Sequence, residues 1–201
     1  LTSLTMQTDR SVMHANEEEV IKGCLEKDVK SMEILYKKYA PKLYNCALRY
    51  TKKEEDAEDV LQDAFINIFE HMKQYNGKGT LAGWMTTVVI NQALMLYRKN
   101  LQHLQYQAGD YEEYKDSIKD TSIIQNDFLT HQLLLELIQS LPDGYRIVFN
   151  MHEIEGYSYD EIADFLNCTP STCRSQLFRA KKILQEKINY YNKHNEEYNR
   201  I

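Results

Sequence analysis

Apolar residues recur at intervals of three and four along most of this chain, which is the spacing that lines one face of a helix. The clearest run lies between residues 53 and 71 and contains Val60, Leu61, Ala64, Phe65, Ile68 and Phe69. Gly77 and Gly79 mark a loop, after which Thr80 can cap a further helix that reaches Asn100. The 201 residues include only 7 Gly and 3 Pro, so turn-forming residues are scarce. The pattern predicts an all-α protein with long helices.

Start and stop signals divide the N-terminal half further. Asn16 precedes three glutamates, 17–19, which predicts an N-cap and a helix that Gly23 weakens or ends. A second helix is expected near residues 28–39. Because Pro suits the first turn of a helix, Pro41 is expected to begin a third one that ends at about Thr51.

The C-terminal half begins with another helical stripe. Its apolar members are Phe128, Leu134, Leu135, Ile138 and Leu141. Pro142 is then expected to start a helix that stops at Gly156. The apolar positions of that helix are Ile147, Val148, Met151 and Ile154.

The strongest local signal follows Gly156. Ser158 and Glu161 have the spacing of a capping box, in which each side chain pairs with a backbone N–H of the other residue. The box opens a short helix, residues 167–169 form a turn, and Pro170 occupies the first position of a second helix. A short helix, a tight turn and a second helix form the helix-turn-helix pattern.

The second helix of this pattern has two unlike faces. A rotation of 100° per residue places Cys173, Leu177, Ala180 and Leu184 on one face, which we expect to be core. The opposite arc contains Ser171, Arg174, Ser175, Phe178, Arg179 and Lys182. Arg can bond guanine at two points, Ser can bond a phosphate or a base edge, and Phe can contact a thymine methyl. A solvated amphipathic helix is the plain alternative, but the capping box, the turn and the absence of acids on this arc favour nucleic acid.

Charge alternates in blocks along the chain, although the net charge is −6. Six carboxylates and no base lie between residues 54 and 63, whereas residues 71–100 contain no carboxylate. Residues 105–127 are again acidic, and residues 170–187 are basic. Such alternation indicates more than one partner.

Several function classes lack their signatures. The sequence contains no Walker loop, no GxGxxG, no GxSxG and no metalloprotease helix, so we expect no enzyme and no cofactor. Cys24, Cys46, Cys168 and Cys173 form no CxxC pair, so we expect buried thiols without a metal, and no redox role for Cys173. No run approaches the length of a membrane span, and no secretory signal is recognisable, so we expect a cytoplasmic protein without stable membrane insertion.

The elements group into two small helical domains joined by a flexible linker, the second of them a four-helix domain with the helix-turn-helix. The expected boundaries are an N-terminal tail at 1–16, a first domain at 17–100, a linker at 101–126, a second domain at 127–190 and a C-terminal tail at 191–201. The linker lacks a sustained apolar period and is rich in charge and Tyr.

Three blocks, in order, resemble sigma factors of the sigma-70 family, in its extracytoplasmic function (ECF) group. They are the segment from Ala57 to Phe65, the segment from Gly83-Trp84 through Asn91 to Arg98-Lys99, and the segment from Leu141-Pro142 through Gly156-Tyr157-Ser158 to Lys181. The resemblance covers most of residues 25–190. It implies docking on the beta-prime clamp helices and the beta flap of core RNA polymerase, and recognition of the minus-ten and minus-thirty-five elements of promoter DNA.

The resemblance also implies roles for individual residues. The minus-thirty-five set is Ser171, Arg174, Ser175, Phe178, Arg179, Lys181 and Lys182. The minus-ten set is Lys73, Tyr75, Lys78, Asn91, Tyr97, Arg98 and Lys99. The polymerase-docking set is Asp56, Asp59, Gln62, Asp63 and Phe65. Trp84, the only Trp, is expected to anchor a core.

The resemblance leaves the role of the linker and of the acidic helix open between two alternatives each. An anti-sigma factor is implied as a further partner. The acidic linker either threads toward the template channel or serves as a solvated tether. From the residues alone, the acidic run at 54–63 fits either a surface that docks on a partner or a solvated helix start. A stand-alone helix-turn-helix regulator that binds an operator as a dimer is the second hypothesis. A helical enzyme or adaptor with a protein-binding basic face is the third.

Overall fold

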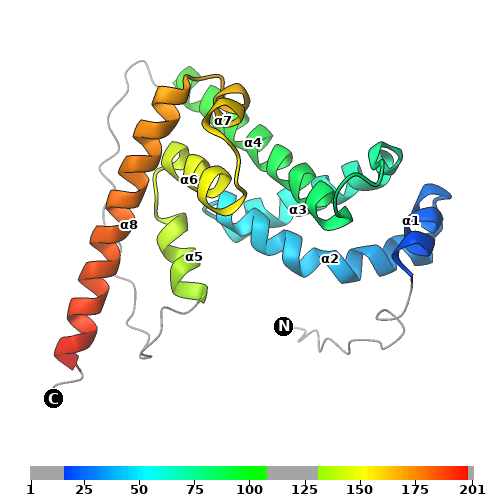
Figure 1. Cartoon of the computed structure of the whole chain (residues 1–201), viewed down its shortest axis with the longest axis horizontal. Coiled ribbons are helices and arrows are strands. Elements are labelled where there is room, and N and C mark those ends of the chain that lie inside the picture. The colour runs from blue at the N-terminus through cyan, green and yellow to red at the C-terminus, as the bar shows by residue number, and fades with distance from the viewer. Residues whose placement is uncertain (1–15, 108–130, 199–201) are drawn as a thin grey trace. The chain divides into compact units, whose positions relative to one another are not determined.

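The structure, a computed structural model, describes residues 16–107 and 131–198, and these residues form helices and no strands. The all-α prediction is confirmed for them. The helices follow one another in chain order from α1 to α8 (Figure 1). The chain divides into two compact units, of which unit 1 holds residues up to 47 and 53–96, and unit 2 holds 48–52 and everything from 97 onward. Phe128 and most of the predicted linker and N-terminal tail lie outside the described residues.

Unit 1 begins with α1 (Glu17–Leu25), and the predicted cap is confirmed because the Asn16 side chain accepts a hydrogen bond from the Glu18 N–H. The chain then turns sharply into α2. A Cβ at Gly23 would lie 2.0 Å from the Ser31 Oγ, so only glycine permits this approach. The Asp28 carboxylate accepts hydrogen bonds from the Ser31 N–H and hydroxyl, which caps the next helix and lowers the pKa of Asp28.

The prediction of two helices at 28–39 and 41–51 is wrong, because α2 (Val29–Tyr50) is continuous and contains Pro41. Proline there removes one hydrogen bond to the carbonyl four residues earlier, which costs about 3 kcal/mol in an isolated helix. The buried side chains on the two sides of Pro41 continue one face of α2, namely Leu35, Tyr39, Leu43 and Ala47. Pro41 itself is exposed, so burial of this shared face outweighs the local penalty.

The rest of unit 1 consists of α3 (Glu54–Glu70), the short 3-10 turn η2 (Met72–Gln74) and α4 (Leu81–Gln107) up to residue 96. The predicted stripe of α3 is buried except for Phe69, which is half-buried. The Thr80 hydroxyl accepts a hydrogen bond from the Gly83 N–H at 3.1 Å, as predicted. The helix α4 continues to Gln107, so residues 101–107 are helical where a linker was predicted. No Gly or Pro interrupts this stretch, and its Leu and Gln residues favour a helix.

Unit 2 contains α5 (His131–Gln139), α6 (Asp143–Phe149), the π-helical turn η3 (Asn150–Ile154), α7 (Tyr159–Leu166) and α8 (Pro170–Tyr198). The predicted helix after Pro142 is therefore a short α-helix that widens into a π turn before Gly156, whose φ is +79°. Helix α8 continues to Tyr198, so most of the predicted C-terminal tail is helical. Residues 171–198 contain neither Gly nor Pro to end the helix.

The core of unit 2 lies against α8. The predicted core face is confirmed, since Cys173, Leu177, Ala180 and Leu184 are all buried. Leu141 packs with Ala180 and Leu184, and the half-buried side chains of Leu137, Tyr145, Phe149 and Ile183 cover them. Burial of this stripe orients α8 about its own axis and leaves its opposite arc in solvent.

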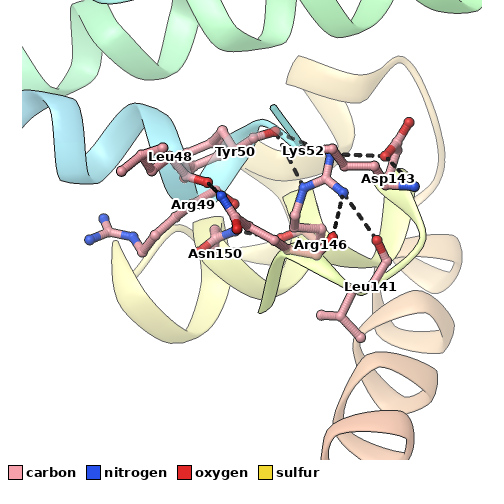
Figure 2. A network of polar contacts seen from close by, with 9 residues as sticks. Leu48, Arg49, Tyr50, Lys52, Leu141, Asp143, Arg146 and Asn150 are labelled. Atoms are coloured by element: carbon pink, nitrogen blue, oxygen red, sulfur yellow. Dashed lines mark hydrogen bonds and ion pairs between the residues drawn. The ribbon is translucent and has the colours of Figure 1, made fainter. Parts of the chain in front are cut away.

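A buried arginine organises the polar part of unit 2 (Figure 2). Arg146 is 4% exposed, and its Nε and Nη2 donate to the Tyr50 carbonyl at 3.3 and 3.2 Å. Its Nη1 donates to the Leu141 carbonyl at 3.0 Å, and its Nη2 lies 2.8 Å from the Asp143 Oδ1. The guanidinium therefore exchanges its hydration for a fixed set of oxygen acceptors.

Two neighbouring side chains complete this arrangement at the end of α2. The Asn150 Nδ2 donates to the Arg49 carbonyl at 2.7 Å, and the Gln139 Nε2 donates to the Leu48 carbonyl at 2.9 Å. The last carbonyls of a helix lack partners within the helix, so these side chains act as C-caps supplied by other elements. The Arg49 side chain also pairs with Glu155.

Replacement of the central guanidinium tests its importance. We expect Arg146→Met to lower the free energy of unfolding by about 3 kcal/mol, because the Tyr50 and Leu141 carbonyls lose their buried donor while side-chain volume is kept. Urea denaturation of the whole chain, followed by circular dichroism, measures the change. Lys182→Met, at an exposed position, is the control and should alter stability by less than about 0.5 kcal/mol. Equal stability of the two variants would contradict the assignment.

The capping box of α7 is the second test of local structure. It is present as predicted, since the Glu161 N–H donates to the Ser158 Oγ and the Ser158 N–H donates to the Glu161 carboxylate. We expect Ser158→Ala to cost about 1 kcal/mol of stability. Ser158→Thr keeps the hydroxyl and should retain most of it. Equal denaturation midpoints for the Ala and Thr variants would show that the cap does not stabilise unit 2.

Candidate nucleic-acid and partner-binding surfaces

The exposed arc of α8 is the first candidate surface. The structure places all seven residues of the predicted minus-thirty-five set in solvent, namely Ser171, Arg174, Ser175, Phe178, Arg179, Lys181 and Lys182. Phe178 is 71% exposed, which is unusual for a large aromatic side chain. An apolar ring among cations and hydroxyls provides the mixed chemistry that base edges and phosphates require.

The start of α8 is positioned by its own turn. Asn167 adopts the left-handed conformation at the end of α7, with φ +52°, which Asn tolerates better than most residues. The Thr169 hydroxyl accepts a hydrogen bond from the Thr172 N–H at 3.1 Å and so caps α8. From the sequence, Thr169 was expected only as a turn residue. Ser171 lies in the capped first turn of α8 and faces solvent.

Side chains from other elements hold two of the arginines in the arc. The Arg174 guanidinium lies 5.1 Å from the centre of the Tyr159 ring, and that ring stacks on His152 with 4.3 Å between centres. The Arg179 Nη1 donates to the Tyr145 hydroxyl at 3.1 Å. Both contacts restrict flexible side chains before any ligand binds, which reduces the entropy lost on binding.

Both lysines of the minus-thirty-five set lie near acids, and the Lys182 Nζ is 4.0 Å from a carboxylate oxygen of Glu186. The Lys181 Nζ lies 2.8 Å from a carboxylate oxygen of Glu153, in η3. A phosphate has to compete with that carboxylate for Lys181. Sequence reasoning missed Tyr145, Glu153 and Tyr159, because periodicity within α8 carries no information about side chains from α6, η3 and α7.

The predicted minus-ten set is divided between the two units. Lys73, Lys78 and Asn91 are exposed in unit 1. Tyr75 is half-buried, and its hydroxyl donates to the Gly79 carbonyl at 3.1 Å, which closes the loop before α4. Its ring lies 5.8 Å from that of Trp84, which is half-buried and so only partly fulfils the expectation of a core anchor.

The other three members of that set belong to the part of α4 in unit 2. Tyr97 is half-buried, whereas Arg98 and Lys99 are exposed. The Arg98 Nη2 donates to the Phe165 carbonyl, at the end of α7. The Arg98 side chain therefore already has an acceptor within unit 2, although its remaining donors can reach a phosphate.

An apolar hollow in unit 1 is the second candidate surface. It has a volume of about 600 Å³ and lies between α2 and α3. Its lining is formed by Tyr36, Tyr44, Glu58, Leu61, Gln62, Phe65, Ile66 and Phe69. Tyr36 and Ile66 are 46% and 50% exposed, so apolar surface lies open beside the charged start of α3.

The predicted docking set surrounds this hollow only in part. Asp59, Gln62 and Asp63 are exposed on α3, and Asp56 is half-buried. Phe65 is buried at 4% exposure, with its ring 4.6 Å from Tyr36 and 5.8 Å from Phe69. Phe65 therefore supports the floor of the hollow and offers little surface to a partner. Sequence reasoning missed Tyr36 and Tyr44, whose spacing of eight residues on α2 could have indicated a shared face.

The electrostatic field at the hollow is negative. Burial raises the pKa of Tyr44 above its usual value, and the nearby carboxylates of Glu54, Glu58 and Glu55 raise it further. Both causes act against a phenolate, and the second arises from the carboxylates at the start of α3. An apolar floor beside a negative field is complementary to a partner that presents aliphatic and basic side chains.

Comparison with known proteins accounts for both units. Residues 35–102 match sigma-70 region 2, and residues 131–184 match sigma-70 region 4. Together these matches include more than half of the chain, in the order of the family. Within the described residues, no helix is long and apolar enough to cross a membrane.

Individual relatives carry the same assignment. The chain is 27% identical to the ECF RNA polymerase sigma-E factor of Haemophilus influenzae and 28% identical to that of Escherichia coli K12. These alignments cover 80% of this chain and 89% and 88% of the relatives. The crystal structure of the sigma factor RpoE in complex with the anti-sigma factor NepR, from Bartonella quintana, shares the fold with a TM-score of 0.51. The two sequences are 23% identical, and the match covers 98% of that chain and 80% of this one. The chain belongs to the sigma-70 family of sigma factors, in its ECF group.

Proposed function

We propose that this protein is a non-catalytic initiation factor that binds core RNA polymerase in the cytoplasm and directs transcription from promoters with its own minus-thirty-five and minus-ten elements. One observation carries the proposal. The exposed arc of α8 presents Arg174, Ser175 and Phe178 together on a helix that a capped helix-turn-helix positions. The match of residues 35–102 to sigma-70 region 2 supports the polymerase-dependent form of DNA recognition.

The minus-thirty-five element is read by the arc of α8. Arg174, Ser175, Phe178 and Arg179 face the major groove, because helix-turn-helix proteins insert the second helix there. Ser171, Lys181 and Lys182 contact phosphates, which give affinity and register but little sequence information. The stacked pair of Tyr159 and Arg174 supports this role, since it holds the guanidinium over a rigid ring before DNA binds.

The minus-ten element is read by unit 1 together with the end of α4. Exposed Lys73 and Lys78 attract the phosphates of a separated strand, and the exposed amide of Asn91 can bond a base edge at two points. The absence of carboxylates between residues 71 and 100 supports this use, because no acid repels the strand. Tyr75, Tyr97, Arg98 and Lys99 complete the proposed set.

Core polymerase docks on the apolar hollow and its acidic border. Asp56, Asp59, Gln62 and Asp63 steer a basic surface, while Tyr36 and Ile66 receive its aliphatic side chains. The beta-prime clamp helices are the partner that the family assigns to this segment, and the beta flap is the partner for unit 2. An anti-sigma factor is a further proposed partner, as the Bartonella quintana RpoE complex with NepR suggests.

A stand-alone operator-binding regulator explains less of the chain. It requires a dimer with matched half-sites, whereas the acidic border of α3 and its apolar hollow have no role in DNA binding. The net charge of −6 also favours weak DNA binding by the free chain. When one promoter carries both elements, binding at one element raises the effective concentration of the other unit at its own element, so neither unit has to bind DNA tightly alone.

Charge reversal at the docking surface tests polymerase binding. In run-off transcription with purified core polymerase and a genomic promoter library, we expect Asp59→Arg to lower protein-dependent transcripts at least about tenfold, since one misplaced charge at an interface costs about 1–2 kcal/mol or more. The matched control is Glu26→Arg, which makes the same charge change at the exposed C-terminal end of α1. Equal loss in both variants, or in neither, would contradict docking at α3.

Salt dependence separates base readout from phosphate contact in α8. About four phosphate contacts give this unit a slope near −3.6 in a plot of log affinity against log salt concentration. For the holoenzyme on a minus-thirty-five duplex, we expect Lys182→Ala to reduce the slope by about 1 and to weaken all sequences alike. Arg174→Ala should instead lose about 1–3 kcal/mol on the preferred sequence alone. Fluorescence anisotropy across a salt series measures both, and identical behaviour of the two variants would refute the division.

A further inference from the structure

Two cysteines face each other across the turn of the helix-turn-helix. The Sγ atoms of Cys168 and Cys173 are 3.4 Å apart. Cys168 lies in the turn and is half-buried, whereas Cys173 lies in the first turns of α8 and is fully buried. The other two cysteines, Cys24 and Cys46, are buried in unit 1.

The backbone on both sides of the pair is held by hydrogen bonds. The Cys168 N–H donates to the Ala163 carbonyl at 3.0 Å, and the Cys173 N–H donates to the Thr169 carbonyl at 3.1 Å. A disulfide has an S–S distance of about 2.05 Å, so the two sulfurs have to approach by roughly 1.4 Å. Rotation of the half-exposed Cys168 side chain can provide most of that movement, because Cys173 is confined by the core of unit 2.

We propose that Cys168 and Cys173 form a redox-modification site, at which a hydroperoxide converts the two thiols into an intramolecular disulfide that thiol reductants reverse. Such reversible bridges are the form in which disulfides serve as sensors in reducing compartments. No redox role was expected for Cys173, because a small apolar thiol packs well in a core. The fold supplies the proximity that the spacing alone does not predict.

The chemistry balances in two steps. The Cys168 thiol loses its proton to solvent, its thiolate attacks the hydroperoxide, and the O–O bond breaks. Cys168 becomes a sulfenic acid, and the leaving alkoxide, or hydroxide from hydrogen peroxide, takes a proton from solvent and departs as an alcohol or as water. The Cys173 sulfur then attacks the Cys168 sulfur, an S–S bond forms, and the departing hydroxide takes the Cys173 proton and leaves as water. In total, two thiols lose two electrons and two protons, and the peroxide is reduced.

Accessibility decides the order of the two thiols. The half-buried Cys168 can meet a small peroxide, whereas Cys173 has no exposed surface. Burial also raises the pKa of the Cys173 thiol, and its contact with Cys168 raises it further, so Cys173 remains protonated when the first step occurs. Cys173 therefore acts as the resolving thiol, beside the sulfur that it attacks.

The bridge acts on the surface that reads DNA. Cys173 belongs to the buried face of α8 and directly precedes Arg174, so a pull on its sulfur shifts the first turns of α8. We expect the oxidised protein to misplace Ser171 and Arg174 and to bind the minus-thirty-five element more weakly. This consequence, unlike the disulfide itself, rests on the proposed function.

Peptide mass spectrometry tests the site without reference to DNA or polymerase. The full chain with Cys24→Ala and Cys46→Ala is treated with hydrogen peroxide, alkylated with N-ethylmaleimide and digested with trypsin. Residues 147–174 form one tryptic peptide that contains both remaining cysteines. We expect this peptide to resist alkylation, to be lighter by two hydrogens, and to be alkylated twice after reduction with dithiothreitol.

Single-thiol variants and a functional readout complete the test. With Cys173→Ala, oxidation should stop at a sulfenic acid on Cys168 that dimedone traps, and with Cys168→Ala the buried Cys173 should stay reduced. Two alkylated cysteines after peroxide, or a bridge only between chains, would overturn the proposal.

Oxidised holoenzyme should bind the minus-thirty-five element about tenfold more weakly for each base edge that α8 no longer reaches. Unchanged affinity despite the bridge would refute the effect on α8, whereas inactivity of the reduced protein would count against the proposed function alone.

Discussion

The buried guanidinium of Arg146 is the constraint on which the rest of unit 2 depends. A charge that is 4% exposed is tolerated only where oxygen acceptors replace its hydration, and here they come from Tyr50, Leu141 and Asp143. Tyr50 is the last residue of α2, Leu141 precedes α6, and Asp143 is the first residue of α6. Their geometry holds α6 in one orientation relative to the end of α2, as Asn150 and Gln139 do for the neighbouring carbonyls.

The position of the proposed DNA-binding arc of α8 depends on that arrangement. Leu141 and the half-buried Tyr145 and Phe149 pack against α8, so α6 determines which face of α8 is core. The Tyr145 hydroxyl then receives a hydrogen bond from Arg179, and Tyr159 underlies Arg174. The two arginines proposed to read bases thus contact Tyr145, which packs on the core of unit 2, and Tyr159, which stacks on His152. These contacts reduce the entropy that the arginine side chains lose on DNA binding.

The two candidate surfaces have opposite chemistry for a physical reason. The hollow between α2 and α3 combines apolar area with carboxylates, which attracts a basic protein surface and repels nucleic acid. The arc of α8 combines cations and hydroxyls with a single exposed ring, which suits a groove of DNA. A chain with a net charge of −6 can carry both an acidic and a basic surface, provided that each type of charge is confined to its own helix.

The sequence by itself determined those features in which neighbouring residues act on one another. The caps at Asn16, Thr80 and Ser158, the core stripe of α8 and its exposed arc depend on spacings within one helix, and all are present in the structure. Only the tertiary structure decided the rest, because it depends on contacts between residues far apart in the chain. Burial of one continuous face carries α2 through Pro41, the Phe65 ring of α3 contacts Tyr36 of α2, and Arg146 donates to the carbonyl of a residue that precedes it by 96 positions. The contact between Cys168 and Cys173 is local in the chain, but it depends on the hydrogen-bonded turn between α7 and α8, which the spacing of the two cysteines alone does not predict.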